Sequence, residues 1–214
     1  MSIDVKICGL KTAEAIDAAL EGGASHVGFI FFPKSPRNVS PAEAGALRSA
    51  ATGRAQVVAV TVDAGDDELA AIVDAVRPDM LQLHGKETPA RVAEVRDRFL
   101  LPVMKAVSVG EPADLMAVHT YSEVADRMLL DAKAPKGSDL PGGNGVAFDW
   151  RMLAAIDPNL DYMLSGGINA SNLEEAMRIA NPRGIDVSSG VESSPGVKDV
   201  DLIRQFLALA RSAS

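Results

Sequence analysis

Short apolar runs alternate along this chain with longer segments in which apolar residues recur at helical spacing. Most of the short runs are apolar nearly throughout, which is typical of parallel strands that are covered on both faces. We therefore expect strands at Val5–Gly9, His26–Phe32, Gln56–Asp63, Met80–His84, Val103–Val107, Arg127–Asp131, Tyr162–Ser165 and Gly184–Ser188.

The segments between these runs carry the start signals of helices. Thr12 precedes an amphipathic stretch that reaches Leu20, and its hydroxyl can cap the first turn. Ser40 and Thr88 are each followed by a proline, which is favoured at the first helical position. Further helices are expected at Asp66–Val76, Arg91–Phe99, Ser171–Ile179 and Asp199–Arg211.

Strict alternation of eight strands with about eight helices predicts one (β/α)₈ barrel over residues 1–214, at the lean end of the usual length. A flavodoxin-like open sheet with misassigned terminal strands is the second interpretation. No shift in composition marks a domain boundary. The longest irregular stretch, Ala132–Ala147, is rich in glycine and proline, and we expect it to act as a lid over the site.

Charge and composition narrow the functional classes. The net charge of −8 argues against a nucleic-acid-binding surface, which needs clustered cations, but leaves room for an anionic small substrate held by backbone N–H groups. The single cysteine excludes an intramolecular disulfide and a zinc site built from cysteines. No leader peptide or membrane-spanning run is evident. We expect a soluble cytoplasmic protein, with a monomer favoured.

The first expected strand presents candidate chemistry at its end. Lys6 and Cys8 share one face of this strand, while Val5 and Ile7 share the other. If the apolar pair faces the helices, Lys6 and Cys8 point into the barrel. A thiol near an ammonium is expected to have a lowered pKa and to serve as a base or nucleophile. Alternatively, Cys8 is a small buried packing residue.

Asp131 follows the apolar residues of the sixth expected strand. Catalytic groups of this fold lie at the carboxyl ends of the strands, so Asp131 is a candidate general acid or base. A proton donor near neutral pH needs a pKa well above the ordinary value of about 3.9. A salt bridge or a cap on the following loop is the alternative.

Glycine-rich turns follow the last two expected strands. Gly166 and Gly167 come after the seventh, and Ser188, Ser189 and Gly190 after the eighth. Barrels frequently bind phosphate between these two turns, where glycine allows close approach of backbone N–H groups. Each turn alone is weak evidence, because turns need glycine in any case.

Three further side chains are candidates for substrate contact. Arg37, in a proline-flanked loop, can bind a carboxylate with two parallel hydrogen bonds, or it is a solvated loop arginine. His84 either contacts substrate or is a hydrogen-bonded histidine at the barrel rim. Asp186 alternates with Ser188 and is expected on the same inward face.

These residues lie in segments that resemble phosphoribosylanthranilate isomerases of tryptophan biosynthesis. The matching segments run in order through the whole chain, which makes the set specific. They are KICGL (Lys6–Leu10), GFIFFPKSPR (Gly28–Arg37), QLHG (Gln82–Gly85), LLDA (Leu129–Ala132), GGNGVAFDW (Gly142–Trp150), LSGGI (Leu164–Ile168) and DVSSGVESSPGVKD (Asp186–Asp199).

The resemblance implies an aldose–ketose isomerase that converts N-(5′-phosphoribosyl)anthranilate to the open-chain deoxyribulose phosphate by an Amadori rearrangement, without metal or organic cofactor. It implies that Asp131 is the general acid and Cys8 the general base. Arg37 would bind the anthranilate carboxylate. The turns with Gly166–Gly167 and Ser188–Gly190 would bind the phosphate, with His84 and Asp186 as weaker substrate contacts.

Two other functions compete with this one. The related isomerase of histidine biosynthesis, and a bifunctional isomerase, pair two aspartates, and Cys8 in place of a carboxylate disfavours both. A catalytically silent barrel that senses a phosphorylated metabolite needs only the two anion-binding sites. The presence of both Cys8 and Asp131 argues against such a sensor.

Overall fold

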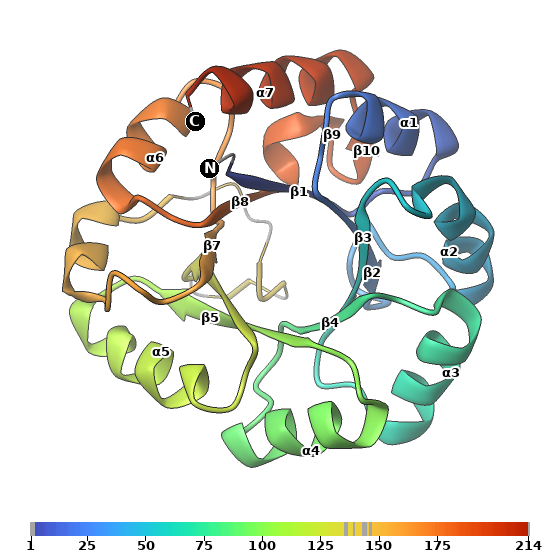
Figure 1. Ribbon diagram of the computed structural model, residues 1–214, viewed down its shortest axis with the longest axis horizontal. Helices are drawn as coiled ribbons and strands as arrows, with labels where there is room; N and C mark the ends of the chain where they lie inside the picture. The colour runs from blue at the N-terminus through green and yellow to red at the C-terminus, as the bar shows by residue number, and fades with distance from the viewer. Residues whose placement is uncertain (1–2, 135–136, 139, 143–144, 146, 214) are drawn as a thin grey trace.

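The computed structural model describes residues 3–134, 137–138, 140–142, 145 and 147–213. Eight parallel strands close into a barrel in chain order, with β8 paired to β1, and the helices form an outer ring (Figure 1). The expected (β/α)₈ fold is therefore confirmed, and the open sheet is excluded. The strands are β1 (Asp4–Cys8), β2 (His26–Phe31), β3 (Gln56–Thr61), β4 (Met80–Leu83), β5 (Val103–Val109), β6 (Arg127–Ala132), β7 (Tyr162–Leu164) and β8 (Gly184–Val187).

Seven α-helices cover the described part of the barrel: α1 (Ala13–Glu21), α2 (Pro41–Arg48), α3 (Asp66–Val76), α4 (Pro89–Phe99), α5 (Leu115–Ser122), α6 (Leu173–Ala180) and α7 (Val200–Ser212). Short 3₁₀ helices are η1 (Ser49–Ala51), η2 (Pro112–Asp114), η3 (Trp150–Ala155) and η4 (Ser189–Val191). Within the described residues, none of these helices is both long and apolar enough to cross a membrane.

About eight helices were expected in all, and no helix was placed in advance between β6 and β7, where the 3₁₀ helix η3 covers the barrel. Asp149 caps the start of η3 by accepting a hydrogen bond from the backbone N–H of Arg151. Ile156, directly after η3, is extended, and Pro158 disfavours helical backbone at the residue before it. These two signals leave too few residues for a regular α-helix.

Most of the expected helix starts are confirmed as side-chain caps. The hydroxyls of Thr12, Ser40 and Thr88 each accept a hydrogen bond from the backbone N–H three residues later. Ser40 also forms a full capping box, because the carboxylate of Glu43 accepts from its backbone N–H. The α6 helix begins two residues later than expected, at Leu173.

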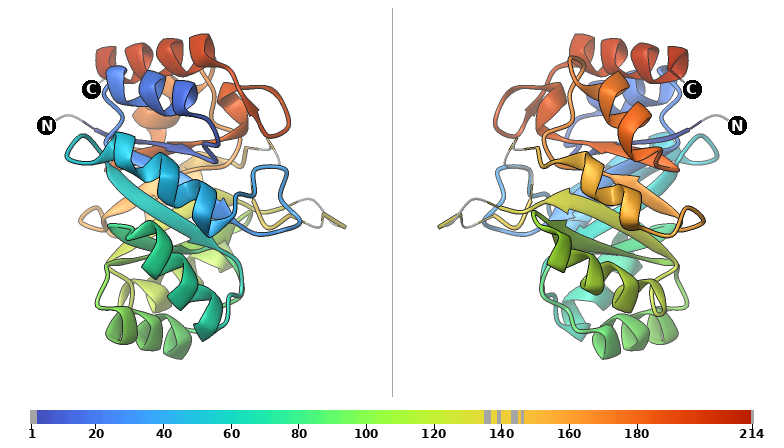
Figure 2. Two further views of the ribbon diagram at one scale, coloured as in Figure 1. Left: turned by 90° about the vertical axis from the view of Figure 1, so that its right-hand side faces the viewer. Right: turned by 90° about the vertical axis from the view of Figure 1, so that its left-hand side faces the viewer.

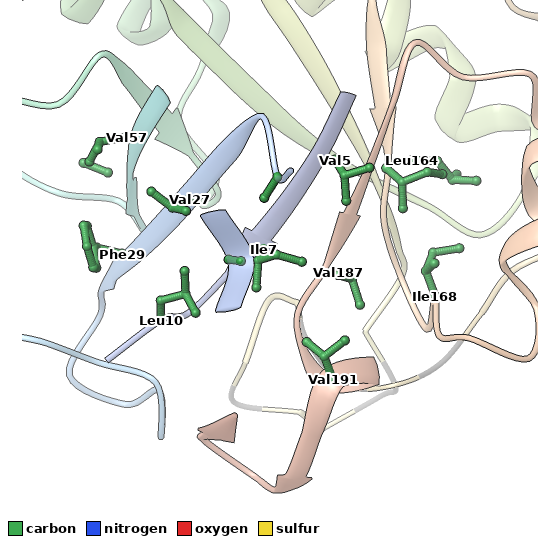
Figure 3. Close-up of a cluster of buried hydrophobic side chains, with 14 of the residues drawn as sticks. Val5, Ile7, Leu10, Val27, Phe29, Val57, Leu164, Ile168, Val187 and Val191 are labelled. Atoms are coloured by element: carbon green, nitrogen blue, oxygen red, sulfur yellow. The ribbon is translucent and has the colours of Figure 1, made fainter. Parts of the chain in front are cut away.

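Two apolar clusters form the core on either side of the strands. The outer cluster, between strands and helices, includes Val5, Ile7, Val27 and Phe29 (Figure 3). The inner cluster fills the barrel and contains the expected inward residue Cys8. Its other buried members are Val58, Val60, Met80, Met104, Ala106, Leu129 and Met163. The alternation along β1 therefore sorts its side chains as the sequence predicts.

One end of the barrel carries the irregular segments. The loop after β2 and a small hairpin of β9 (Glu192–Ser194) and β10 (Val197–Lys198) project from the same end (Figure 2). This is the end at which the parallel strands finish. The expected lid at 132–147 lies partly outside the described residues, as does the GGNGVAFDW segment.

Candidate active site

A pocket opens at the carboxyl ends of the strands. It gathers residues at the ends of β1, β6 and β8 and residues directly after β4, β7 and β8, which are far apart in the sequence. Its lining comprises Cys8, His84, Asp131, Ser165, Gly166, Gly167, Ile168, Asp186, Ser188 and Ser189. Eight of the ten residues expected at the site are therefore in this set, and Arg37 and Gly190 are not.

Cys8 and Lys6 lie side by side on the inner face of β1, next to a gap left by a glycine. Gly28 is the partner of Cys8 in the neighbouring strand β2. A Cβ atom built at Gly28 would lie 3.2 Å from Cys8 Sγ and 3.2 Å from Lys6 Nζ, which is tighter than ordinary packing. The missing side chain at Gly28 therefore makes room for the thiol and the ammonium together.

Lys6 is fully buried and ion-paired. Its Nζ donates to Asp186 Oδ1 at 2.8 Å, and Ser165 Oγ donates to Asp186 Oδ2 at 3.1 Å. Burial acts to lower the pKa of Lys6, but the carboxylate of Asp186 and the thiol of Cys8 outweigh it and raise the pKa. Asp186 is thus inward-facing as expected, and its two oxygens already accept hydrogen bonds within the protein.

The expected lowering of the Cys8 pKa is wrong. Burial raises the pKa of Cys8, while Lys6 and Lys198 act in the opposite direction without overcoming it. The lowering of the Cys8 pKa by Lys6 is partly cancelled, because the carboxylate of Asp186 raises the pKa of the same thiol. The thiol is consequently the favoured form of Cys8 at neutral pH before substrate binds.

Asp131 lies at the end of β6 and is almost completely buried. Its Oδ1 accepts a hydrogen bond from the backbone N–H of Ala132 at 2.9 Å, and its Oδ2 lies 3.1 Å from His84 Nε2. The other ring nitrogen of His84, Nδ1, lies 2.9 Å from Gln82 Nε2. His84 is therefore a hydrogen-bonded partner of the candidate acid, and Gln82 extends the chain into the barrel.

A buried ion pair beneath the loop after β4 holds the position of His84. Lys105 Nζ donates to the backbone oxygens of Leu83 and Gly85, at 3.1 and 2.7 Å, and to Glu87 Oε2 at 2.8 Å. The two backbone oxygens flank His84 in the chain. Neither Lys105 nor Glu87 was predicted from the sequence, although a lysine inside an apolar strand is a signal for a buried partner.

The two glycine-rich turns pack against each other beside the pocket. Gly166 and Gly167 have φ of +84° and +65°, which glycine adopts without strain. A Cβ at Gly190 would collide with the backbone oxygen of Ile168, so glycine is needed for this close approach. Among the described residues, none accepts a hydrogen bond from the backbone N–H of Gly166, Gly167 or Ser189. These donors line the pocket as an anion site requires.

The Ser188 side chain makes contacts within the protein. Its hydroxyl donates to the backbone oxygen of Cys8 at 3.1 Å and lies 3.2 Å from Lys198 Nζ. The Ser188 side chain therefore ties the end of β8 to the end of β1. Ser189 begins η4 and also lines the pocket.

Arg37 is buried against the β9–β10 hairpin, so the solvated alternative is wrong. It donates from Nε to Glu192 Oε1 at 2.7 Å and from Nη2 to Glu192 Oε2 at 2.9 Å. Lys198 Nζ also bonds Glu192 Oε1, at 2.7 Å. Burial acts to raise the pKa of Glu192, but Arg37 and Lys198 lower it overall. Neither Glu192 nor Lys198 was predicted as part of the site, although both lie within the segment Asp186–Asp199.

These contacts define what the pocket can do chemically. It combines a buried thiol, a buried carboxyl group in contact with an imidazole, and backbone donors suited to an anion. Over the ranges that the structure describes, no three His, Cys, Asp or Glu side chains gather so as to hold a metal ion. The groups present are those of general acid–base chemistry on an anionic substrate.

Comparison with known proteins agrees with this chemistry. A sequence model of the family described as N-(5′-phosphoribosyl)anthranilate (PRA) isomerase matches residues 5–208. The N-(5′-phosphoribosyl)anthranilate isomerase of Mesorhizobium japonicum is 65% identical over 213 residues, covering 100% of this chain and 97% of its own.

Solved structures give the same result. Phosphoribosyl anthranilate isomerase from Thermotoga maritima superposes with a TM-score of 0.89 at 33% identity, covering 98% of this chain and 99% of its own. A phosphoribosyl anthranilate isomerase in complex with reduced 1-(o-carboxyphenylamino)-1-deoxyribulose 5-phosphate superposes with a TM-score of 0.86 at 32% identity and the same coverage. The chain belongs to the N-(5′-phosphoribosyl)anthranilate isomerase family.

Proposed function

We propose that this chain isomerises N-(5′-phosphoribosyl)anthranilate to 1-(o-carboxyphenylamino)-1-deoxyribulose 5-phosphate in tryptophan biosynthesis, with Asp131 as general acid and Cys8 as general base. The observation that carries the proposal is that Cys8 and Asp131 line one pocket together with the glycine-rich turns after β7 and β8. A phosphorylated aminosugar presents an acid-sensitive ring and an anion at opposite ends, which matches this arrangement.

The reaction needs one proton donated and one removed. Asp131 gives its proton to the furanose ring oxygen, the bond from that oxygen to the first sugar carbon breaks, and the nitrogen lone pair forms an iminium ion. The Cys8 thiolate then takes the proton from the second sugar carbon, and the electrons of that C–H bond neutralise the iminium. In the resulting enol, the hydroxyl on the second sugar carbon then loses its proton to solvent and the first sugar carbon gains a proton from solvent, which gives the ketone. The iminium ion itself is the electron sink.

The surroundings of the two groups differ in what they do for the two proton transfers. The carboxylate that Asp131 leaves behind is stabilised by the N–H of Ala132 and by His84. Cys8 must first lose its own proton to solvent, and burial opposes that loss. Deprotonation of the thiol is favoured once the positively charged iminium lies beside it, because opposite charge favours the ionised form.

The remaining residues bind the two ends of the substrate. The backbone N–H groups of Gly166, Gly167 and Ser189 are proposed to hold the phosphate. Arg37 is proposed to bind the anthranilate carboxylate while Glu192 holds its guanidinium in place through two parallel hydrogen bonds. Binding energy at these remote groups orients the reacting carbon.

The test is the loss of anthranilate-type fluorescence when purified protein meets freshly generated phosphoribosylanthranilate. We expect rapid loss with the wild type. Cys8→Ser and Asp131→Asn should each lower kcat by about a hundredfold or more, since each lacks one proton-transfer group. A folded wild-type protein without turnover would refute the isomerase function. Near-wild-type turnover of either variant would remove that residue from the mechanism.

We propose in addition that the protein is a monomer. In the described part of the chain, the exposed large apolar side chains come from four different segments: Leu100, Met116, Val197 and Leu209. Stable dimers generally bury a contiguous patch whose centre is apolar. Light scattering behind size-exclusion chromatography should give one chain mass, and twice that mass would refute the proposal.

A further inference from the structure

Gln82 has a polar side chain inside the barrel that the proposed reaction does not use. It lies on β4, two residues before His84, so the two side chains share the inward face. The Gln82 residue is 1% exposed, and its Nε2 lies 2.9 Å from His84 Nδ1. A chain of contacts therefore runs from Gln82 through the imidazole to Asp131 Oδ2.

The donors and acceptors of this chain fit a single protonation pattern. The amide nitrogen of Gln82 can only donate, so its contact at 2.9 Å requires a lone pair on His84 Nδ1. A neutral imidazole then carries its hydrogen on Nε2. Asp131 Oδ2, 3.1 Å away, can accept from that hydrogen.

Retaining an amide at this position has a cost. Gln82 Oε1 is buried and has no hydrogen-bond partner within the described residues. Its neighbours on the inner face include Met80 and Met104, which belong to the inner apolar cluster. A methionine at position 82 would fill similar volume without leaving an unpaired acceptor. The amide is thus poorly explained by packing alone.

We propose that Gln82 is a positioning residue that holds His84 in the neutral tautomer with hydrogen on Nε2. In this tautomer His84 Nε2 has no lone pair, so the imidazole cannot take the proton of Asp131 and can only donate to it. The Asp131 proton then goes to the ring oxygen of the substrate, and His84 stabilises the carboxylate that remains. The expected effect on turnover rests on the proposed function, whereas the expected tautomer of His84 does not.

The test combines ring nitrogen-15 NMR with kinetics on the full chain. The chain has three histidines, so the spectrum is simple, and His84→Asn assigns the His84 signals. We expect wild-type His84 to show a protonated Nε2 and an unprotonated Nδ1. Gln82→Glu places an acceptor beside Nδ1, so the hydrogen should move to Nδ1. Gln82→Met removes the donor and should leave a mixture of tautomers.

Turnover should follow the tautomer. We expect kcat to fall about a hundredfold in Gln82→Glu and about tenfold in Gln82→Met, with KM within about threefold of wild type, because substrate contacts are unchanged. Gln82→Met should be no less stable than wild type in urea unfolding, since it removes the unpaired oxygen.

The NMR and kinetic results test the role of Gln82 separately from the proposed isomerase function. Hydrogen on Nδ1 of wild-type His84 would overturn it, as would a Gln82→Met variant that keeps the Nε2–H tautomer or full kcat. If the wild type shows the expected tautomer but no turnover, the assignment of Gln82 to His84 stands and the isomerase function fails.

Discussion

The ion pair between Lys6 and Asp186 lies inside the barrel, and removing one partner should be strongly destabilising. Lys6 is 0% exposed, and its Nζ lies 2.8 Å from Asp186 Oδ1. Lys6→Met removes the ammonium and leaves the Asp186 carboxylate buried, with the hydroxyl of Ser165 as a neutral donor. Breaking a buried pair in this way costs about 3–5 kcal/mol. Domains of this kind have about 5–15 kcal/mol in total, so the variant should fold but unfold at clearly lower urea.

A double-mutant cycle separates the ion pair from its surroundings. Urea unfolding would be followed by circular dichroism for wild type, Lys6→Met, Asp186→Asn and the double variant. The double variant contains neither charge, so it should regain most of the stability that either single change removes. The coupling free energy, which is the sum of the two single-variant losses minus the loss of the double variant, should therefore exceed about 4 kcal/mol.

The same variant also tests the influence of Lys6 on the proposed base. Lys6 lowers the pKa of Cys8 relative to burial alone, and the carboxylate of Asp186 raises it. Lys6→Met should therefore move the rising limb of kcat/KM to higher pH. A loss of stability below about 1 kcal/mol, or a double variant as unstable as the single ones, would refute the reasoning about the pair. If the rising limb of kcat/KM stays at the same pH, Lys6 does not influence the pKa of Cys8 as proposed.

Three further predictions follow from burial. Because burial raises the pKa of Cys8, wild-type kcat/KM should rise with pH through and beyond the usual thiol value of about 8.5, and a plateau already at pH 6 would contradict this. Gly28→Ala should lower kcat/KM about tenfold and cost about 1–3 kcal/mol, whereas Gly65→Ala, with nothing within 4 Å of the new Cβ, should be nearly silent in the same assays. Burial lowers the pKa of His26 to about 4. The free energy of unfolding therefore includes about 3 kcal/mol that is present above pH 6.5, where the ring is neutral, and that is lost as the pH falls towards 4. In urea unfolding between pH 7 and pH 4, the His26→Gln variant should lose less stability than the wild type. An unchanged pH dependence would show that His26 is not the cause of the loss.

The sequence predicted the architecture well because local rules decide it. Near-continuous apolar runs marked all eight strands within about two residues at each end. Hydroxyl caps at Thr12, Ser40 and Thr88 marked three helix starts, since such a cap bonds N–H groups only a few residues away. The 3₁₀ helix η3 and the β9–β10 hairpin were not anticipated, because short elements carry little periodic signal.

The site was predicted only in part. The alternation along β1 placed Cys8 inward, and strand-end position placed Asp131 and His84 at the pocket. Glu192 and Lys198 were missed, since nothing in a local pattern marks a loop glutamate as the buried partner of a distant arginine. The contact between His84 and Asp131 likewise joins β4 and the end of β6.

The sequence by itself determined which residues form strands, which face of β1 turns inward, and which polar groups end the strands. Those properties follow from periodicity, and periodicity is read over a few residues. The tertiary structure decided the partners and the protonation of the polar groups. Lys6 meets Asp186 across 180 residues of sequence, and Arg37 meets Glu192 across 155. Only the closed barrel brings such groups together and removes them from water, and burial reverses the direction expected for the pKa of Cys8.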